Sequence, residues 1–197
     1  MKIGFLASHG GSNMQAIIDA CKAGTLDATP AVVISNNGDS KALERARQEG
    51  IAWHHLSGKV LGDGEDLDQA ILDALLDAGV DIIVLAGYMR KIGPRVLGHF
   101  RGRILNIHPA LLPKFGGQGM YGMNVHRAVV DAGESESGAT IHLVDEHYDT
   151  GPVIAQASVA LDPGDDAEDV AAKVLKVEHR LFAETLQKIA TGEIKLP

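Results

Sequence analysis

The sequence predicts a single α/β domain, built on a mostly parallel, Rossmann-like sheet with helices on both faces. Short apolar runs alternate with helical patterns along all 197 residues. The most apolar run, residues 80–86, is typical of a central strand that is buried on both faces. Glycine is frequent, at 23 residues, which indicates many tight turns close to ligands.

The first strand–turn–helix unit occupies residues 2–24. Residues 2–7 form an apolar run that predicts a buried strand. After a turn over residues 8–12, apolar residues recur three and four positions apart, which predicts an amphipathic helix that Gly24 ends. The apolar positions of this helix are Met14, Ile17, Ile18 and Cys21.

The next stretch repeats this alternation. Residues 31–35 predict a second strand, and the Asn-Asn-Gly sequence at 36–38 predicts a turn. A helix is expected over residues 41–49, ended by Gly50, and a further strand over residues 51–56.

A polar loop over residues 58–64 precedes the helix that leads into the central strand. Gly79 ends this helix, and residues 80–86 follow directly as the strand. The apolar face of the helix consists of Leu67, Ala70, Ile71, Ala74, Leu75 and Ala78.

The second half has the same rhythm with longer loops. A strand over residues 103–107 runs into His108 and Pro109, and a long loop covers residues 110–122. Strands are expected over residues 139–144 and 153–160. Two helices complete the pattern, with apolar positions Val125, Ala128, Val129 and Ala132 in the first and Val170, Val174, Val177, Leu181 and Leu186 in the second.

Charge and composition exclude several functional classes. With 18 Lys and Arg against 26 Asp and Glu, the formal net charge is −8, which argues against a general nucleic-acid or membrane-surface binder. Cys21 is the single cysteine, so the chain forms no intramolecular disulfide and no cysteine-based zinc site, which fits the cytoplasm. No apolar run approaches the length of a membrane span. We therefore expect small-molecule partners, with an oligomer left open.

The turn from Ser8 to Asn13 follows the first strand and suits an anion. Its two glycines allow a close approach of the backbone, Ser12 or Asn13 can cap the next helix, and the free N–H groups favour a phosphate. The pattern matches neither G-x-G-x-x-G nor a Walker loop, which favours a phosphate monoester over a dinucleotide. The alternative is a plain tight turn with a good cap.

Asn106 and His108 stand at the end of a predicted strand and share one of its faces, about 7 Å apart. An amide and an imidazole that project together into a crevice suit the stabilisation of an oxyanion and the transfer of a proton. A strand-end histidine bonded only to the backbone is the alternative.

Asp149 precedes a Gly-Pro pair after the strand over residues 139–144. It is either a turn former or the carboxylate that orients His108 and raises its pKa. His142 and His147, near several acids, could suggest a metal cluster, but no H-E-x-x-H spacing supports one, and we expect no metal.

Four segments together resemble one family closely. They lie in order and cover nearly the whole chain, and the family is that of the folate-dependent glycinamide ribonucleotide formyltransferases of purine synthesis. The segments are Gly11-Ser12-Asn13, residues 86–90 (Ala-Gly-Tyr-Met-Arg), residues 106–113 (Asn-Ile-His-Pro-Ala-Leu-Leu-Pro) and residues 149–154 (Asp-Thr-Gly-Pro-Val-Ile).

The resemblance implies a formyltransferase fold over residues 1–197, with a phosphate-binding half at about 1–100 and a folate-binding and catalytic half at about 101–197. It implies transfer of a formyl group from the co-substrate 10-formyltetrahydrofolate to the amine of 5-phosphoribosylglycinamide, in the synthesis of IMP, without a metal. Asn106, His108 and Asp149 resemble the catalytic trio of the family. The implied ligand contacts are Gly11, Ser12, Asn13 and Glu178 for the phosphorylated amine, and Met89, Arg90, Lys91, Ile92, Asn106, Asp145, Glu146, His147, Tyr148 and Asp149 for the folate.

The sequence departs from the family pattern at several positions. Ala110 stands where the family often has serine, Gly64 where some members have a basic residue for the folate, and Leu175 where some have a polar amide. The resemblance implies that residues 110–122 form a mobile loop near the active site, and residues 118–123 lengthen this loop relative to the shortest members of the family. These departures affect single contacts rather than the trio.

Two other readings stay open. Another reaction of the superfamily, formyl transfer to methionyl-tRNA or hydrolysis of formyltetrahydrofolate, would be expected to come with an additional barrel or regulatory domain. A non-catalytic module that binds a phosphorylated metabolite would keep the turn at 8–13 and have no need of His108.

Overall fold

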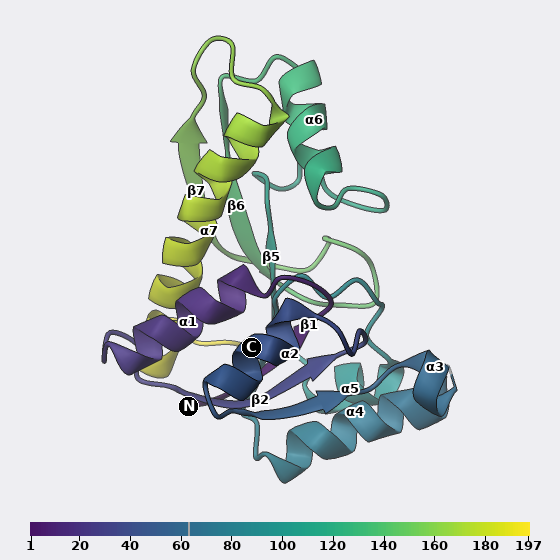
Figure 1. Ribbon diagram of the computed structural model, residues 1–197. Helices are drawn as coiled ribbons and strands as arrows, with labels where there is room; N and C mark the ends of the chain where they lie inside the picture. Colours follow the sequence, from purple (N-terminus) through teal and green to yellow (C-terminus); the bar gives the residue numbers. More distant parts are fainter. Residues whose placement is uncertain (63) are drawn as a thin grey trace.

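The computed structural model describes residues 1–62 and 64–197, which form one sheet of seven strands in the order β3-β2-β1-β4-β5-β6-β7 (Figure 1). From β3 to β5 all neighbouring strands are parallel, whereas β6 is antiparallel to both β5 and β7. The prediction of a mostly parallel α/β sheet is confirmed. The strands are β1 (Lys2–Ala7), β2 (Thr29–Ser35), β3 (Ala52–His55), β4 (Ile82–Leu85), β5 (Ile104–His108), β6 (Glu136–Leu143) and β7 (Val153–Ala160).

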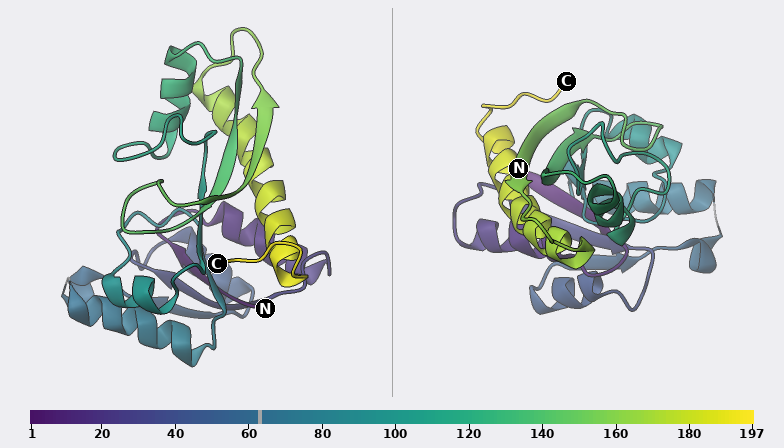
Figure 2. Two further views of the ribbon diagram at one scale, coloured as in Figure 1. Left: turned by 180° about the vertical axis from the view of Figure 1, so that it is seen from behind. Right: turned by 90° about the horizontal axis from the view of Figure 1, so that it is seen from above.

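Helices pack on both faces of this sheet (Figure 2). Because successive side chains of a strand point to opposite faces, Phe5 of β1 joins the core beneath α1, α2 and α7, while Leu6 joins the core beneath α4 and α5. The helices are α1 (Ser12–Lys22), α2 (Lys41–Gln48), α3 (Gly58–Leu61), α4 (Glu65–Asp77), α5 (Pro94–His99), α6 (Met123–Asp131) and α7 (Ala167–Ala190).

Besides shifts of one to three residues at the ends of several strands, the elements differ from the prediction in three places. β4 pairs only over Ile82–Leu85, because Val80 still bonds back to the end of α4. The predicted polar loop over 58–64 contains the single turn of α3. Helix α5 was not predicted, because its six residues include Pro94 and Gly98 and are too few to show a periodicity.

One end of the molecule is narrower and carries the long loop over residues 110–122. Here β6, β7 and the first turns of α7 extend away from the parallel strands, with α6 beside them (Figure 1). Val129 of α6 packs against Val170 and Val174 of α7 in a small separate core. Among the described residues, none of the helices has the length and apolar character that a membrane crossing needs.

Candidate active site

The structure brings Asn106, His108 and Asp149 together. Asn106 and His108 lie two positions apart on β5, and the side chain of His108 is only 3% exposed. Asp149 comes from the loop between β6 and β7, which folds back over the sheet. Its Oδ2 atom is 3.5 Å from Nδ1 of His108.

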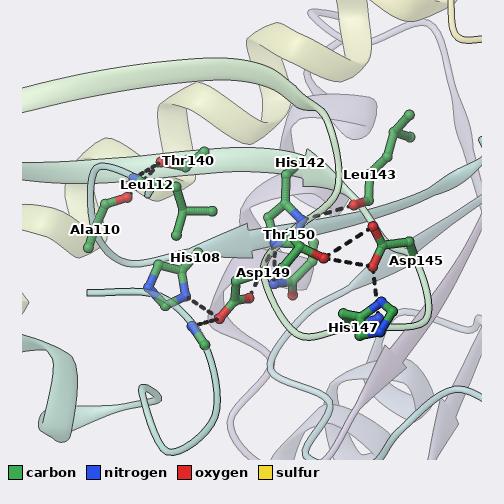
Figure 3. Close-up of polar contacts among 12 residues, drawn as sticks. His108, Ala110, Leu112, Thr140, His142, Leu143, Asp145, His147, Asp149 and Thr150 are labelled. Atoms are coloured by element: carbon green, nitrogen blue, oxygen red, sulfur yellow. Dashed lines mark hydrogen bonds and ion pairs between the residues drawn. The ribbon is translucent and has the colours of Figure 1, made fainter. Parts of the chain in front are cut away.

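The loop that carries Asp149 is held by its own polar contacts. Asp145 accepts hydrogen bonds from the backbone N–H of His147 at 2.8 Å and from the hydroxyl of Thr150 at 3.1 Å (Figure 3). Gly151 lies so close to the carbonyl oxygen of Leu143 that a Cβ atom there would come within 1.8 Å of it. Asp149 itself takes a left-handed conformation, with φ at 57°, which is uncommon outside glycine and typical of functional loops.

His142 of β6 adds a fourth side chain that the sequence pointed to only as a metal candidate. Its Nε2 atom is 3.0 Å from the amide nitrogen of Asn106 and 3.5 Å from Oδ1 of Asp149. Figure 3 shows Asp149 between His108 and His142. The antiparallel register sets Asn106 opposite His142, and that register could not be deduced from the sequence alone.

Two opposing effects act on His108. Burial lowers its pKa and outweighs the Asp149 carboxylate and the Phe115 carbonyl, which both raise it. Asp149 thus raises the pKa of His108 as expected, but burial is the larger effect, and the pKa of His108 is lowered overall in the chain without ligands. For Asp149, burial works to raise the pKa, but the contacts with His142, the N–H of Gly117 and His108 together lower it. Asp149 is thus held as a carboxylate.

The loop over residues 110–122 closes over these side chains. The carbonyl oxygen of Phe115 is 2.7 Å from Nε2 of His108, and the N–H of Gly117 donates to Asp149 Oδ2 at 3.0 Å. Phe115 has φ at 55°, so the bond to His108 is made by a residue in a left-handed conformation that is costly for a bulky side chain. Thr140 anchors the start of the loop by donating to the carbonyl of Ala110 and accepting from the N–H of Leu112.

The predicted phosphate turn lies at the start of α1. Gly11 is the N-cap, with φ at 66°, and no side chain caps the helix. The expectation that Ser12 or Asn13 supplies this cap is wrong, because Ser12 is already the first helical residue. The unbonded N–H groups of the first turn therefore stay available to an anion.

Asn13 faces Glu178 of α7 across the crevice. The amide nitrogen of Asn13 donates to the Glu178 carboxylate at 3.4 Å, and its Oδ1 atom is buried without a partner among the described residues. Glu178 is 8% exposed, and burial raises its pKa to about 7, against the smaller lowering by Asn13. The unpartnered Oδ1 of Asn13 and the buried carboxyl of Glu178 suit a ligand rich in hydroxyls or amines.

A cavity of about 1100 Å³ lies between the 88–93 segment and the loop after β6 that carries Asp149. Of the predicted folate contacts, Arg90, Lys91, Ile92, Asp145, Glu146 and His147 line it. The other predicted folate contacts do not line the cavity: these are Met89, Tyr148, Asn106 and Asp149. The backbone N–H of Met89 instead donates to the Ser8 hydroxyl at 2.7 Å, which joins this wall to the phosphate turn. Gly64 lies at the wall, where a basic residue would have faced the cavity.

The prediction missed the part of the wall that α4 and α5 contribute, including Leu67, Asp68 and Leu97. Asp68 is buried and accepts hydrogen bonds from the N–H groups of Arg95, at 2.7 Å, and Val96, at 3.2 Å. It therefore caps α5 from outside the helix. An Asp inside an amphipathic pattern gives no sequence signal for such a contact.

Residues 1–62 and 64–197 contain no group of three or more His, Cys, Asp or Glu side chains placed to hold a metal ion. His142 and His147, which the sequence raised as a metal pair, have separate partners: His142 contacts Asn106, while the backbone of His147 bonds to Asp145.

Comparison with known proteins identifies the family. The formyl transferase family is matched over residues 1–186. This chain belongs to the formyl transferase family. Among the members of that family, it is 40% identical over 196 residues to the phosphoribosylglycinamide formyltransferase of Escherichia coli, covering 100% of this chain and 90% of the relative. It is 39% identical to the chloroplastic phosphoribosylglycinamide formyltransferase of Arabidopsis thaliana, covering 98% of this chain and 67% of the relative.

Two solved structures have the same fold as this chain. Glycinamide ribonucleotide transformylase 1 from Symbiobacterium toebii superposes with a TM-score of 0.92 at 38% identity, covering 100% of this chain and 91% of that one. A formyltetrahydrofolate deformylase from Pseudomonas syringae has a TM-score of 0.87 at 24% identity, over 63% of its length. At that identity the second likeness shows the fold alone.

Proposed function

We propose that this chain transfers the formyl group of 10-formyltetrahydrofolate to the amine of 5-phosphoribosylglycinamide, in the synthesis of IMP in the cytoplasm. The observation that carries the proposal is the convergence of Asn106, His108 and Asp149, with Asp149 on the same loop as the residues 145–147 that line a cavity of about 1100 Å³. The relatives with about 40% identity carry the names of enzymes for this reaction.

The phosphorylated amine is held at the start of α1. Its phosphate lies against the N–H groups that follow Gly11, including Ser12, where the positive end of the helix dipole favours an anion. Asn13 and Glu178 meet the ribose hydroxyls or the glycinamide, because the Oδ1 atom of Asn13 is buried without a partner among the described residues and the Glu178 carboxyl is buried beside it.

The folate occupies the cavity lined by Arg90, Lys91 and Ile92 on one side and Asp145, Glu146 and His147 on the other. Met89 and Tyr148 complete the proposed folate contacts from the same two segments. In this division residues 1–100 supply the phosphate turn, and residues 101–197 supply the catalytic groups. Two substrates held side by side react as if at a high effective concentration.

The reaction begins when the neutral amine attacks the formyl carbon and the carbonyl oxygen gains a negative charge. An N–H of Asn106 and the Nε2 proton of His108 face that oxygen, which takes the place of the Phe115 carbonyl. One oriented donor of this kind lowers a barrier by about 3–4 kcal/mol. The negative oxygen also counters the effect of burial on the pKa of His108.

The tetrahedral adduct then breaks its bond to the folate nitrogen. The attacking amine loses a proton and the departing folate nitrogen gains one, so that formylated amide and tetrahydrofolate leave with all atoms accounted for. Asp149 supports this exchange by stabilising the charged form of His108. Positioned proton transfer contributes roughly 10²–10⁴-fold.

The direct test combines purified chain, 10-formyltetrahydrofolate and synthetic 5-phosphoribosylglycinamide. Loss of the formyl donor that depends on the amine, with one formylated product per donor consumed, is the expected result. Formyl release without the amine would identify a hydrolase. Binding of the phosphorylated amine with no turnover would identify a non-catalytic module.

A further inference from the structure

His142 is buried and contacts two members of the proposed catalytic trio, yet no step of the reaction uses it. Its side chain is 3% exposed. Among the described residues, its ring contacts the carbonyl oxygen of Leu143, the amide of Asn106 and the carboxylate of Asp149. These partners restrict which ring nitrogen of the buried histidine carries the proton.

The Leu143 carbonyl settles the tautomer. It lies 2.9 Å from Nδ1 of His142, and a carbonyl oxygen only accepts hydrogen bonds, so Nδ1 carries the proton. In the neutral ring Nε2 is then a bare acceptor. The amide nitrogen of Asn106, 3.0 Å away, donates to it.

This contact fixes the orientation of the Asn106 amide. If the amide were turned over, its oxygen would face the lone pair of Nε2, and both acceptors would lose a partner in a buried site. One N–H of Asn106 is thus committed to His142, and the second N–H is left to face a reacting oxygen.

Asp149 approaches the same nitrogen without taking the place of Asn106. Its Oδ1 atom is 3.5 Å from Nε2, too far for a strong hydrogen bond, whereas the amide nitrogen of Asn106 lies at 3.0 Å. In the described part of the chain, the Asn106 amide is therefore the nearest polar partner of Nε2.

We infer that His142 is a positioning residue, which as a neutral Nδ1–H imidazole orients the Asn106 amide toward the formyl oxygen. The inference rests on the proposed formyl transfer. It adds to that proposal a residue that touches neither substrate and acts through Asn106.

Two variants of His142 separate this role from simple packing. In His142→Gln the side-chain oxygen can replace Nε2 as the acceptor, so turnover stays within about threefold of wild type. His142→Leu fills the space without an acceptor, and kcat falls about 10-fold or more, since small misplacements of a catalytic group are costly. KM for 5-phosphoribosylglycinamide stays unchanged in both variants. Thermal unfolding of each verifies folding, and His54→Gln, on the exposed edge strand β3, is the matched histidine control.

A double-mutant cycle provides the decisive comparison. In an Asn106→Ala background, His142→Leu should lower kcat by less than about twofold, because the amide that His142 orients is gone. Equal losses in both backgrounds would overturn the inference, as would full activity of His142→Leu alone. If wild type transfers no formyl group at all, the proposed function fails instead.

A measurement without activity tests the same claim. In chain labelled with ¹⁵N-histidine, the long-range proton couplings of His142 should report the Nδ1–H tautomer at neutral pH, and Asn106→Ala should shift its Nε2 resonance. The Nε2–H tautomer, or an Nε2 resonance indifferent to Asn106, would contradict the inference.

Discussion

At the scale of single residues, the site depends on side chains that burial has made sensitive to their neighbours. His108, Asp149 and Glu178 all lie where solvent is largely excluded, and each has its pKa moved by that exclusion and by specific contacts. Burial alone would neutralise all three groups. The contacts of Asp149 with two histidines and the Gly117 N–H keep it charged, whereas Glu178 has one weak partner and is left near neutrality.

Replacing His108 should affect chemistry rather than binding. We expect His108→Ala to lower kcat at least ~10²-fold, since it removes both an oxyanion donor and a proton carrier. Binding of 5-phosphoribosylglycinamide, measured by calorimetry, should persist because α1 and Glu178 are untouched. Turnover close to wild type would remove His108 from the mechanism.

Because of Glu178, the free energy of unfolding should fall as the pH rises. Its pKa in the folded chain is about 7, against an ordinary glutamate pKa of 4.5, so the folded state binds the proton more tightly than the unfolded state. The contribution of Glu178 to the free energy of unfolding is therefore fully present below pH 4.5 and is lost as the pH rises through about 7. The loss amounts to roughly 3 kcal/mol.

Glu178→Gln, which removes this titration, should therefore raise the free energy of unfolding more at pH 8 than at pH 5. Urea denaturation without ligands at the two pH values measures the difference. Glu184→Gln, at an exposed position of the same helix, is the control. A pH-independent effect of Glu178→Gln would show that its carboxyl is not buried as a neutral group.

At the scale of elements, the short helix α5 depends on a residue of another helix. Its N-cap, Gly93, has no side chain to offer, and the Asp68 carboxylate of α4 accepts the N–H groups of Arg95 and Val96 instead. A Cβ atom on Gly93 would lie 2.2 Å from the Asp68 carboxyl carbon. The Asp68 carboxylate thus joins the two helices at the proposed folate wall, where both Asp68 and Gly93 line the cavity.

Substitution of either Asp68 or Gly93 should weaken the contact between α4 and α5. Asp68→Ala removes the cap and leaves two N–H groups without a partner, which costs about 1–2 kcal/mol. Gly93→Ala drives the helices apart. We expect both variants to raise KM for the folate more than KM for the phosphorylated amine, measured in steady-state kinetics. Asp66→Ala, exposed on α4, is the control, and equal changes in both KM values would contradict a local effect.

Elements with a clear period were predictable, and those built by tertiary contacts were not. The apolar face of α7 and the apolar run around β4 could both be predicted, because a helix face and a buried strand need apolar residues at fixed spacing. Asn106 and His108 share a face for the same reason. Asp149 reaches them only because its loop folds back, and Glu178 lies 165 residues from Asn13; spacing alone predicts neither contact. For these residues the family resemblance supplied what periodicity could not.

At the scale of the whole molecule, one core beneath α1, α2 and α7 unites the two halves of the sheet. Phe182 of α7 is fully buried in it, together with Phe5 of β1 and Ile141 of β6. The phosphate turn, the trio and Glu178 are therefore all attached to the same packed layer. Loss of packing there should disturb the relative positions of groups that contact different substrates.

Phe182→Ala should lower the free energy of unfolding by about 3–5 kcal/mol, because it opens a cavity in this layer. Chemical denaturation measures it, with Trp53→Ala as a comparison at a side chain that is 40% exposed. A loss below about 1 kcal/mol for Phe182→Ala would show that the layer rearranges to fill the space.

The close approach of Gly151 to the Leu143 carbonyl has a consequence for how such chains diverge. With no room for any side chain at that crossing, the path from the end of β6 to β7 must keep its number of residues if Asp149 is to reach His108. By contrast, Gly117, Gly119 and Gly122 have open space around them. Insertions and deletions among descendants of this sequence should therefore accumulate between residues 117 and 122. The stretch from 143 to 151 should retain its length even where its residues are substituted.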